Sequence, residues 1–155
     1  MDRKRETVIL SLGGNIGDTA AYFRHALEIL TENGFVVDRV SGEFRNPAVG
    51  CEEGAADFVN IAVTGKWAGT PQKLLQICQG AEVACGRPAE HPHWYSRTVD
   101  IDIIYCNGIC CNTDALTLPH PLWKQREFVL RPMLEIMPDA VQMIEETMTT
   151  ANVNN

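Results

Sequence analysis

Two aspartates lie two residues apart in the otherwise apolar run DIDIIYC. In an extended strand alternate side chains share a face, and each residue rises by ~3.3 Å, so Asp100 and Asp102 would project together, about 7 Å apart. Ile101, Ile103 and Tyr105 would take the opposite face. Two ionised carboxylates at that separation repel by about 2 kcal/mol at an effective dielectric constant near 20, so a positive group is expected between them. The pattern leaves a metal ion and an arginine as candidates.

Basic side chains gather in the half of the chain that carries this pair. They are Arg87, His91, His93, Arg97, His120, Arg126 and Arg131. The formal net charge of the whole chain is −7, which argues against general nucleic-acid binding, because such binding draws its affinity from neutralised phosphates. A basic neighbourhood beside two carboxylates instead suits a polyphosphate with a divalent metal ion.

Apolar periodicity predicts the elements that must position these residues. Strands are expected over 7–14, 35–44 and 57–67 and at Asp100, with helices after Asp18 and from Pro71 to about Ala84. The order strand, helix, strand, strand, helix, strand is that of a ferredoxin-like βαββαβ sandwich, an α+β fold with an antiparallel-containing sheet. Short helical pieces are expected after Pro119 and over 133–136. The polar stretch 147–155 is expected to be frayed.

Length and cysteine usage suggest the setting. The 155 residues fit one domain, 1–155, with no apolar run long enough to span a membrane and no recognisable signal peptide. The six cysteines contain no CxxC pair and are interpreted as ordinary thiols of a reducing cytoplasm. We expect a cytoplasmic monomer that contacts neither nucleic acid nor membrane.

Four segments together resemble the 6-hydroxymethyl-7,8-dihydropterin pyrophosphokinase family. They are SLGGNIGD, RNPAVG with DFVNIAV, GRPAEHPHWYSRTVDIDII, and LTLPHPLWKQREFVLRPMLEIMPD. The match runs in order from about Val8 to Pro138. An Asp-x-Asp alone also occurs in metal-dependent glycosyltransferases and in structural strands, but its combination with Trp, Arg, Pro-His-Pro and Arg-x-Phe is specific. The resemblance implies transfer of pyrophosphate from ATP to a pterin alcohol in folate biosynthesis.

The resemblance also implies the metal and nucleotide sites. Asp100 and Asp102 would hold two Mg²⁺ ions, and Arg97 would act with them as a catalytic residue. The positions implied to bind ATP are Gln79, Glu82, Arg87, Trp94, Arg97, Ile103, Thr117, His120 and Arg126. Ile103 and Thr117 would recognise adenine through backbone groups. Ordinary structural roles remain open for several of these, such as an exposed helical acid for Glu82.

A pterin site is implied by a second group of residues: Asn46, Val49, Phe58, Asn60 and Phe128. Phe58 and Phe128 would stack on the flat ring, and Asn60 would read its edge, although core packing is the alternative for both phenylalanines. Asn60 lies inside the strand-like run FVNIAV, where an unpaired buried amide would be costly. A ligand or a backbone partner is therefore expected for it.

The sequence departs from the family where a second basic residue usually follows the Gly-Arg of the second loop. Ala89 and Glu90 stand there instead, so weaker binding of MgATP is expected. Two other functions stay open. One, motivated by the lost basic residue, is a non-catalytic pterin- or nucleotide-binding relative; the other is another metal-dependent nucleotide enzyme that uses the same Asp-x-Asp strand.

Overall fold

The computed structural model describes residues 6–46, 57–86 and 99–153. The elements, in chain order, are β1 (Val8–Gly14), α1 (Thr19–Glu32), β2 (Val36–Val40), β3 (Phe44–Asn46), β4 (Phe58–Lys66), α2 (Pro71–Ala84), β5 (Asp100–Cys106), β6 (Cys111–Asn112), β7 (Thr117–Leu118), the 3₁₀ turn η1 (Trp123–Gln125), α3 (Glu127–Ile136) and α4 (Ala140–Val153).

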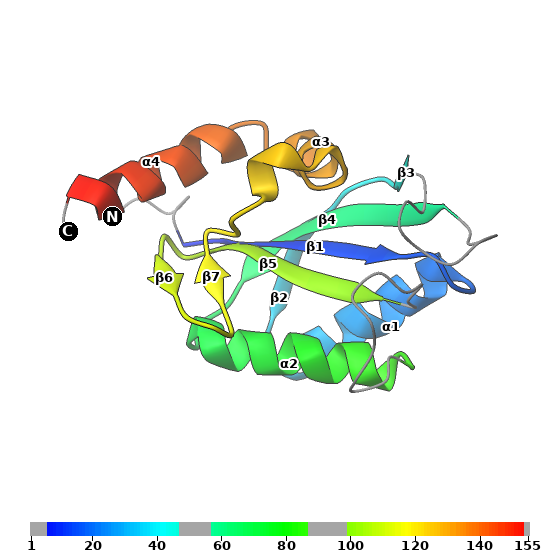
Figure 1. Ribbon diagram of the computed structural model, residues 1–155. Helices are drawn as coiled ribbons and strands as arrows, with labels where there is room; N and C mark the ends of the chain where they lie inside the picture. Colours follow the sequence, from blue (N-terminus) through cyan, green and yellow to red (C-terminus); the bar gives the residue numbers. More distant parts are fainter. Residues whose placement is uncertain (1–5, 47–56, 87–98, 154–155) are drawn as a thin grey trace.

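The central sheet has the order β2-β4-β1-β5, and each neighbouring pair is antiparallel. The short strand β3 pairs with β4 as well. Helices α1 and α2 cover one face of the sheet, and α3 and α4 lie on the other (Figure 1). This arrangement confirms the predicted ferredoxin-like fold.

Two helix starts follow from capping residues. The Asp18 side chain accepts a hydrogen bond from the Ala21 N–H and begins α1, and the Thr70 hydroxyl accepts one from the Lys73 N–H and begins α2. Pro71 occupies the first turn of α2, where its missing N–H costs nothing.

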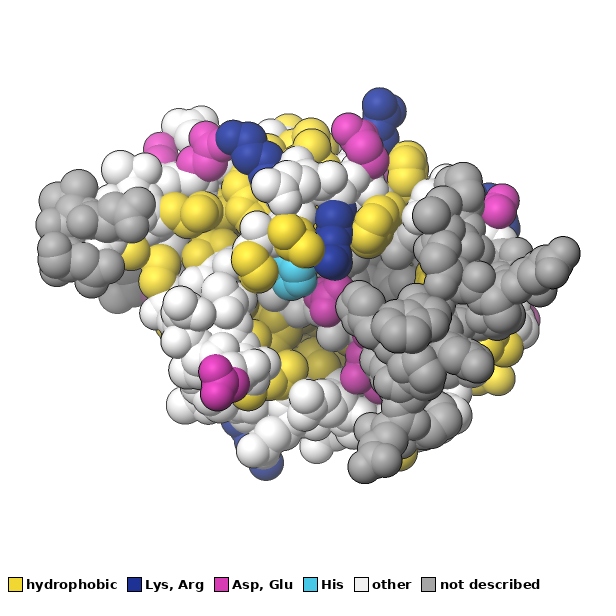
Figure 2. All heavy atoms as spheres, in the orientation of Figure 1, with side chains coloured by type: hydrophobic (Ala, Val, Ile, Leu, Met, Phe, Trp, Pro, Cys, Tyr) yellow, Lys and Arg dark blue, Asp and Glu magenta, His cyan; other side chains and the backbone are white. Residues whose placement is uncertain are grey.

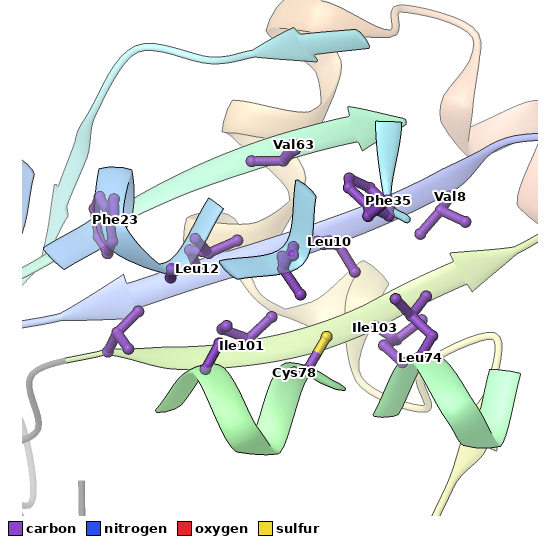
Figure 3. Packing of buried hydrophobic residues seen from close by; sticks show 14 of the residues in the cluster. Val8, Leu10, Leu12, Phe23, Phe35, Val63, Leu74, Cys78, Ile101 and Ile103 are labelled. Carbon is purple, nitrogen blue, oxygen red and sulfur yellow. The ribbon is translucent and has the colours of Figure 1, made fainter. Parts of the chain in front are cut away.

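The sheet separates two apolar cores. Leu10, Leu12 and Ile103 project toward α1 and α2, where Leu74 and Cys78 meet them (Figure 3). The opposite core lies under α3 and α4 and includes Ile9, Ala62, Tyr105, Trp123, Met133 and Ile144. The α3 face of the sheet is only partly apolar. Polar side chains occupy the rest of it, and they form the candidate active site.

Two features of the sheets differ from the sequence prediction. The strand expected over 35–44 is divided into β2 and β3, because the Ser41 hydroxyl accepts from the Ala62 N–H in place of a backbone carbonyl. The two-stranded sheet of β6 and β7 was not predicted.

The expectation of a frayed end is wrong for residues 147–153. These residues complete helix α4, and Thr147 in it is buried. None of the helices in the described ranges is long and apolar enough to cross a membrane.

Candidate active site

The two aspartates lie together on the α3 face of the edge strand β5. Both are half-buried, while Ile101 and Ile103 between and beyond them are buried in the opposite core. Across the strand pair, Asp100 is opposite Gly13 and Asp102 is opposite Ser11. Both carboxylates have electrostatic or hydrogen-bonding partners. The same-face prediction for the pair is confirmed.

The prediction for Tyr105 is wrong, because the strand alternation breaks one residue earlier. Ile9 of β1 pairs with Tyr105, but the next residue, Leu10, pairs with Ile103, so Ile104 is an extra residue in a β-bulge. Tyr105 consequently turns to the α3 face, where it is fully buried. The bulge also serves the site, since the Ile104 carbonyl accepts the His120 backbone N–H at 2.9 Å.

Arg126 stands over the aspartates at the start of α3. Its Nη1 is 4.0 Å from Asp102 Oδ2, and its Cζ lies 5.6 Å from the centroid of the Phe128 ring. The two charged side chains keep 28% and 35% of their surface exposed, so the ion pair is long and solvated and contributes about 0–1 kcal/mol. Arg126 therefore neutralises Asp102 only weakly and stays available to a phosphate.

His120 is held beside this pair in a defined tautomer. Its Nδ1 accepts the Leu122 N–H at 3.1 Å, which places the proton of the neutral ring on Nε2. Burial, with the positive charge of Arg126, lowers the pKa of His120, and Asp100 partly opposes the shift. The side chain is thus a neutral Nε2–H donor at pH 7. In the view of Figure 2, basic, histidine and acidic side chains meet near the middle of the molecule, with hydrophobic side chains beside them.

Four residues assigned to the pterin are described, and they lie on the same sheet face: Asn46 on β3, Phe58 and Asn60 on β4, and Phe128 on α3. Phe58 and Asn60 project opposite to Val59 and Ile61, as the alternation predicts. Asn60 is only 5% exposed, and its Nδ2 donates to Asn46 Oδ1 at 2.6 Å. The expected partner is therefore an amide from another strand, rather than a backbone group.

Gly13 allows this amide to approach β1. A Cβ on Gly13 would lie 2.4 Å from Asn60 Oδ1, and the two residues are direct partners across the strands. Gly13 is not one of the described glycines with a positive φ, so its backbone conformation does not require glycine. The close approach of the amide does.

Phe58 and Phe128 are both half-buried. Phe128 packs against the core beneath α3, so core packing accounts for part of its surface. Neither side chain is sealed inside the protein, and each keeps surface that a ligand could cover.

Glu82 is buried, and the alternative of an exposed helical acid is wrong. Its Oε2 accepts the Ile101 backbone N–H at 2.8 Å at the outer edge of β5. Gln79, one turn earlier on α2, is exposed. Burial raises the pKa of Cys78 to about 12, with further increases from the charges of Glu82 and Asp102.

Some backbone groups of β5 point away from the rest of the sheet. β5 is the last strand of the described sheet, and Glu82 occupies the outward N–H of Ile101. Residues two apart in a strand direct their backbone groups to the same edge, so Ile103 also directs its N–H and carbonyl outward. Thr117, on the nearby β7, is half-buried.

Several predicted site residues lie outside the described residues. They are Val49, Arg87, Trp94 and Arg97, together with the substituted positions Ala89 and Glu90. One residue that sequence reasoning missed is Ser11, which is buried on the α3 face opposite Asp102. The alternation of the apolar residues Leu10 and Leu12 around it was the available signal.

The donor set fits Mg²⁺ only if a nucleotide supplies further ligands. In the part of the chain that the structure describes, no three His, Cys, Asp or Glu side chains form a group that could hold a metal ion. Mg²⁺ commonly takes one or two carboxylates and completes its octahedron with phosphates and water. Two half-buried carboxylates beside a weakly paired arginine match that coordination preference.

Comparisons with known proteins identify the family of this chain. Residues 9–138 match the family described as 7,8-dihydro-6-hydroxymethylpterin-pyrophosphokinase. Proteins named 2-amino-4-hydroxy-6-hydroxymethyldihydropteridine pyrophosphokinase are 37% identical in Bacillus subtilis (94% of this chain, 84% of the relative) and 39% identical in Methylorubrum extorquens (85% and 83%). The relative of that name from Aquifex aeolicus is 34% identical (89% and 84%). The chain therefore belongs to the 7,8-dihydro-6-hydroxymethylpterin-pyrophosphokinase family.

Proposed function

We propose that this chain transfers the pyrophosphoryl group of ATP to the hydroxymethyl oxygen of 6-hydroxymethyl-7,8-dihydropterin in folate biosynthesis. One observation carries the proposal: a carboxylate pair and an amide-and-aromatic site share one sheet face, and Arg126 reaches toward both. Its guanidinium lies 4.0 Å from Asp102 and 5.6 Å from the Phe128 ring centroid. A phosphate bound at the carboxylate pair would then lie next to a ring bound at the amide-and-aromatic site.

The pterin is held by shape and by its polar rim. Phe58 and Phe128 cover its two faces, which suits a flat aromatic ligand. Asn60 and Asn46 form a prearranged amide pair, so their remaining donors and acceptors are oriented toward the ring edge before it arrives. Val49 is assigned a backbone contact with the ring from the sequence.

Asp100 and Asp102 would hold two Mg²⁺ ions together with the phosphates of ATP. When bound, the ions supply charge stabilisation to the phosphates and to the attacking hydroxyl. Because phosphoryl transfer leaves little covalent work to the protein, these carboxylates contribute mainly by positioning.

The nucleotide is held by cationic and polar groups around the carboxylates. Arg126 exchanges its weak pairing with Asp102 for a phosphate oxygen, which its planar guanidinium matches better. His120 donates from Nε2 without adding charge. Arg87, Trp94 and Arg97 join them by the family resemblance, with the guanidinium of Arg97 assigned to phosphate oxygens.

In the reaction the hydroxymethyl oxygen forms a bond to the β-phosphorus of ATP. The bond from that phosphorus to the oxygen bridging to the α-phosphorus breaks, and AMP leaves with that oxygen. The other product is the pterin diphosphate. We propose that the protein performs this reaction as a cytoplasmic monomer.

The proposal is tested by incubating the protein with ATP, Mg²⁺ and the pterin alcohol and measuring AMP. AMP should form only with all three present, and Asp100→Asn or Asp102→Asn should remove most turnover while the fold is retained. Pterin binding without AMP formation would favour the non-catalytic relative that the substitutions at Ala89 and Glu90 leave open.

A further inference from the structure

Ser11 places a hydroxyl on the active-site face that the proposed chemistry does not yet use. It lies on β1, directly opposite Asp102 of β5 on one side and Ala62 of β4 on the other. Its neighbours Leu10 and Leu12 enter the core under α1 and α2, so Ser11 projects to the α3 face. The side chain is only 6% exposed.

This buried hydroxyl has no hydrogen-bond partner among the described residues. Ser41 shows the usual arrangement in the same protein, because its hydroxyl, in a residue 8% exposed, donates to the Gly42 carbonyl and accepts the Ala62 N–H. Buried polar side chains are nearly always paired, so an exception beside a binding site needs an explanation.

The cross-strand neighbours of Ser11 leave one acceptor for its proton. Ala62 is apolar, whereas the carboxylate of Asp102 stands directly opposite. Side chains in such pairs have Cβ atoms roughly 4.5–5.5 Å apart, so a rotation of either side chain brings hydroxyl and carboxylate into contact. In the free protein Asp102 Oδ2 instead lies 4.0 Å from Arg126.

We propose that Ser11 is a positioning residue for Asp102. When nucleotide and metal bind, Arg126 moves to phosphate, and the Asp102 carboxylate turns to accept the Ser11 hydroxyl. Hydrogen bonds of this kind fix the orientation of a ligating carboxylate. The inference rests on the proposed function of Asp102 as a metal ligand.

The test compares Ser11→Ala with Ser41→Ala as a matched control. Mn²⁺ is the probe, and its binding is followed by electron paramagnetic resonance with an ATP analogue that carries a methylene bridge between the α- and β-phosphates. The thermal midpoint of each free protein is measured alongside. The analogue cannot release AMP, so neither readout depends on turnover.

Ser11→Ala should weaken Mn²⁺ binding about tenfold, within the range known for lost carboxylate partners, and should leave the thermal midpoint of the free protein unchanged or higher. Ser41→Ala should do the reverse: the midpoint falls because a buried N–H loses its acceptor, and Mn²⁺ affinity measured well below that midpoint is unchanged.

Unchanged Mn²⁺ affinity in Ser11→Ala would overturn the proposal. So would a fall in its thermal midpoint equal to that of Ser41→Ala, because the hydroxyl would then have a partner in the free protein. If the wild-type protein itself bound no Mn²⁺ with the analogue, the metal site of the proposed function would fail as well, so the two failures are distinguishable.

Discussion

Replacing Gly13 with alanine should disturb the pterin site from the neighbouring strand. The new Cβ would stand 2.4 Å from Asn60 Oδ1, closer than real Cβ contacts, and 3.4 Å from its Cγ. The amide must therefore move, and its 2.6 Å hydrogen bond to Asn46 is lost or distorted. Asn60 is buried, so it cannot turn to solvent for another partner.

The size of the effect follows from two opposing terms. An unsatisfied buried amide costs about 1–3 kcal/mol. Alanine in a strand gains roughly 0.5–1 kcal/mol over glycine from the unfolded state. We expect Gly13→Ala to lower the free energy of unfolding by about 1–2 kcal/mol, and to weaken pterin binding by roughly tenfold, since 1.4 kcal/mol corresponds to a factor of ten.

The assay is denaturant unfolding together with calorimetry of pterin binding in the presence of Mg²⁺ and the methylene analogue of ATP. Gly80→Ala is the control, because a Cβ there meets no atom within 4 Å on an exposed turn of α2. It should raise stability by about 0.5–1 kcal/mol and leave pterin affinity unchanged.

A double-mutant cycle isolates the contact between Gly13 and Asn60. In an Asn60→Ala background the clash is absent, so Gly13→Ala should no longer destabilise the protein. If Gly13→Ala is as stable as the wild type and binds the pterin equally well, the reasoning about this close approach is refuted.

Three further outcomes are expected. Arg126→Ala should raise the KM for ATP while changing the free energy of unfolding by less than about 1 kcal/mol, since its pairing with Asp102 is long and solvated; a larger loss of stability would contradict this. NMR titration of His120 should give a pKa below its usual value of about 6.5. As pH falls through that range, the unfolded chain takes up the proton before the folded protein does, so stability should fall, and less so in His120→Asn. Glu82→Ala should destabilise the protein by about 1–3 kcal/mol, measured by urea unfolding, because the Ile101 N–H loses its acceptor; an unchanged midpoint would argue against that role.

Strand alternation explains why so much of the site could be predicted. It correctly placed Asp100 with Asp102, and Phe58 with Asn60, because a regular strand has a fixed period of two. It failed at Tyr105, since the extra residue of a β-bulge leaves no mark in a run of apolar side chains.

The sequence indicates that a buried polar side chain needs a hydrogen-bond partner, but it does not readily show which distant residue provides it. The buried amide of Asn60 predicts a hydrogen bond, but only the pairing of β3 with β4 identifies Asn46 as its partner. The helical signal of α4 was present, since Ala140, Ile144 and Thr147 follow helical spacing, but threonines near the end suggested fraying. Ala140 and Ile144 are buried in the core under α3 and α4, and Thr147 is buried as well, so packing of this face stabilises the helix.

Following a label on the β-phosphate of ATP tests the central claim most directly. The protein is incubated with Mg²⁺, the pterin alcohol and ATP labelled at the β-phosphorus, and the products are separated. We expect the label in the pterin diphosphate, unlabelled AMP in equal amount, and no release of label without the pterin. ADP carrying the label, or labelled pyrophosphate free in solution, would contradict attack by the pterin hydroxyl on the β-phosphorus.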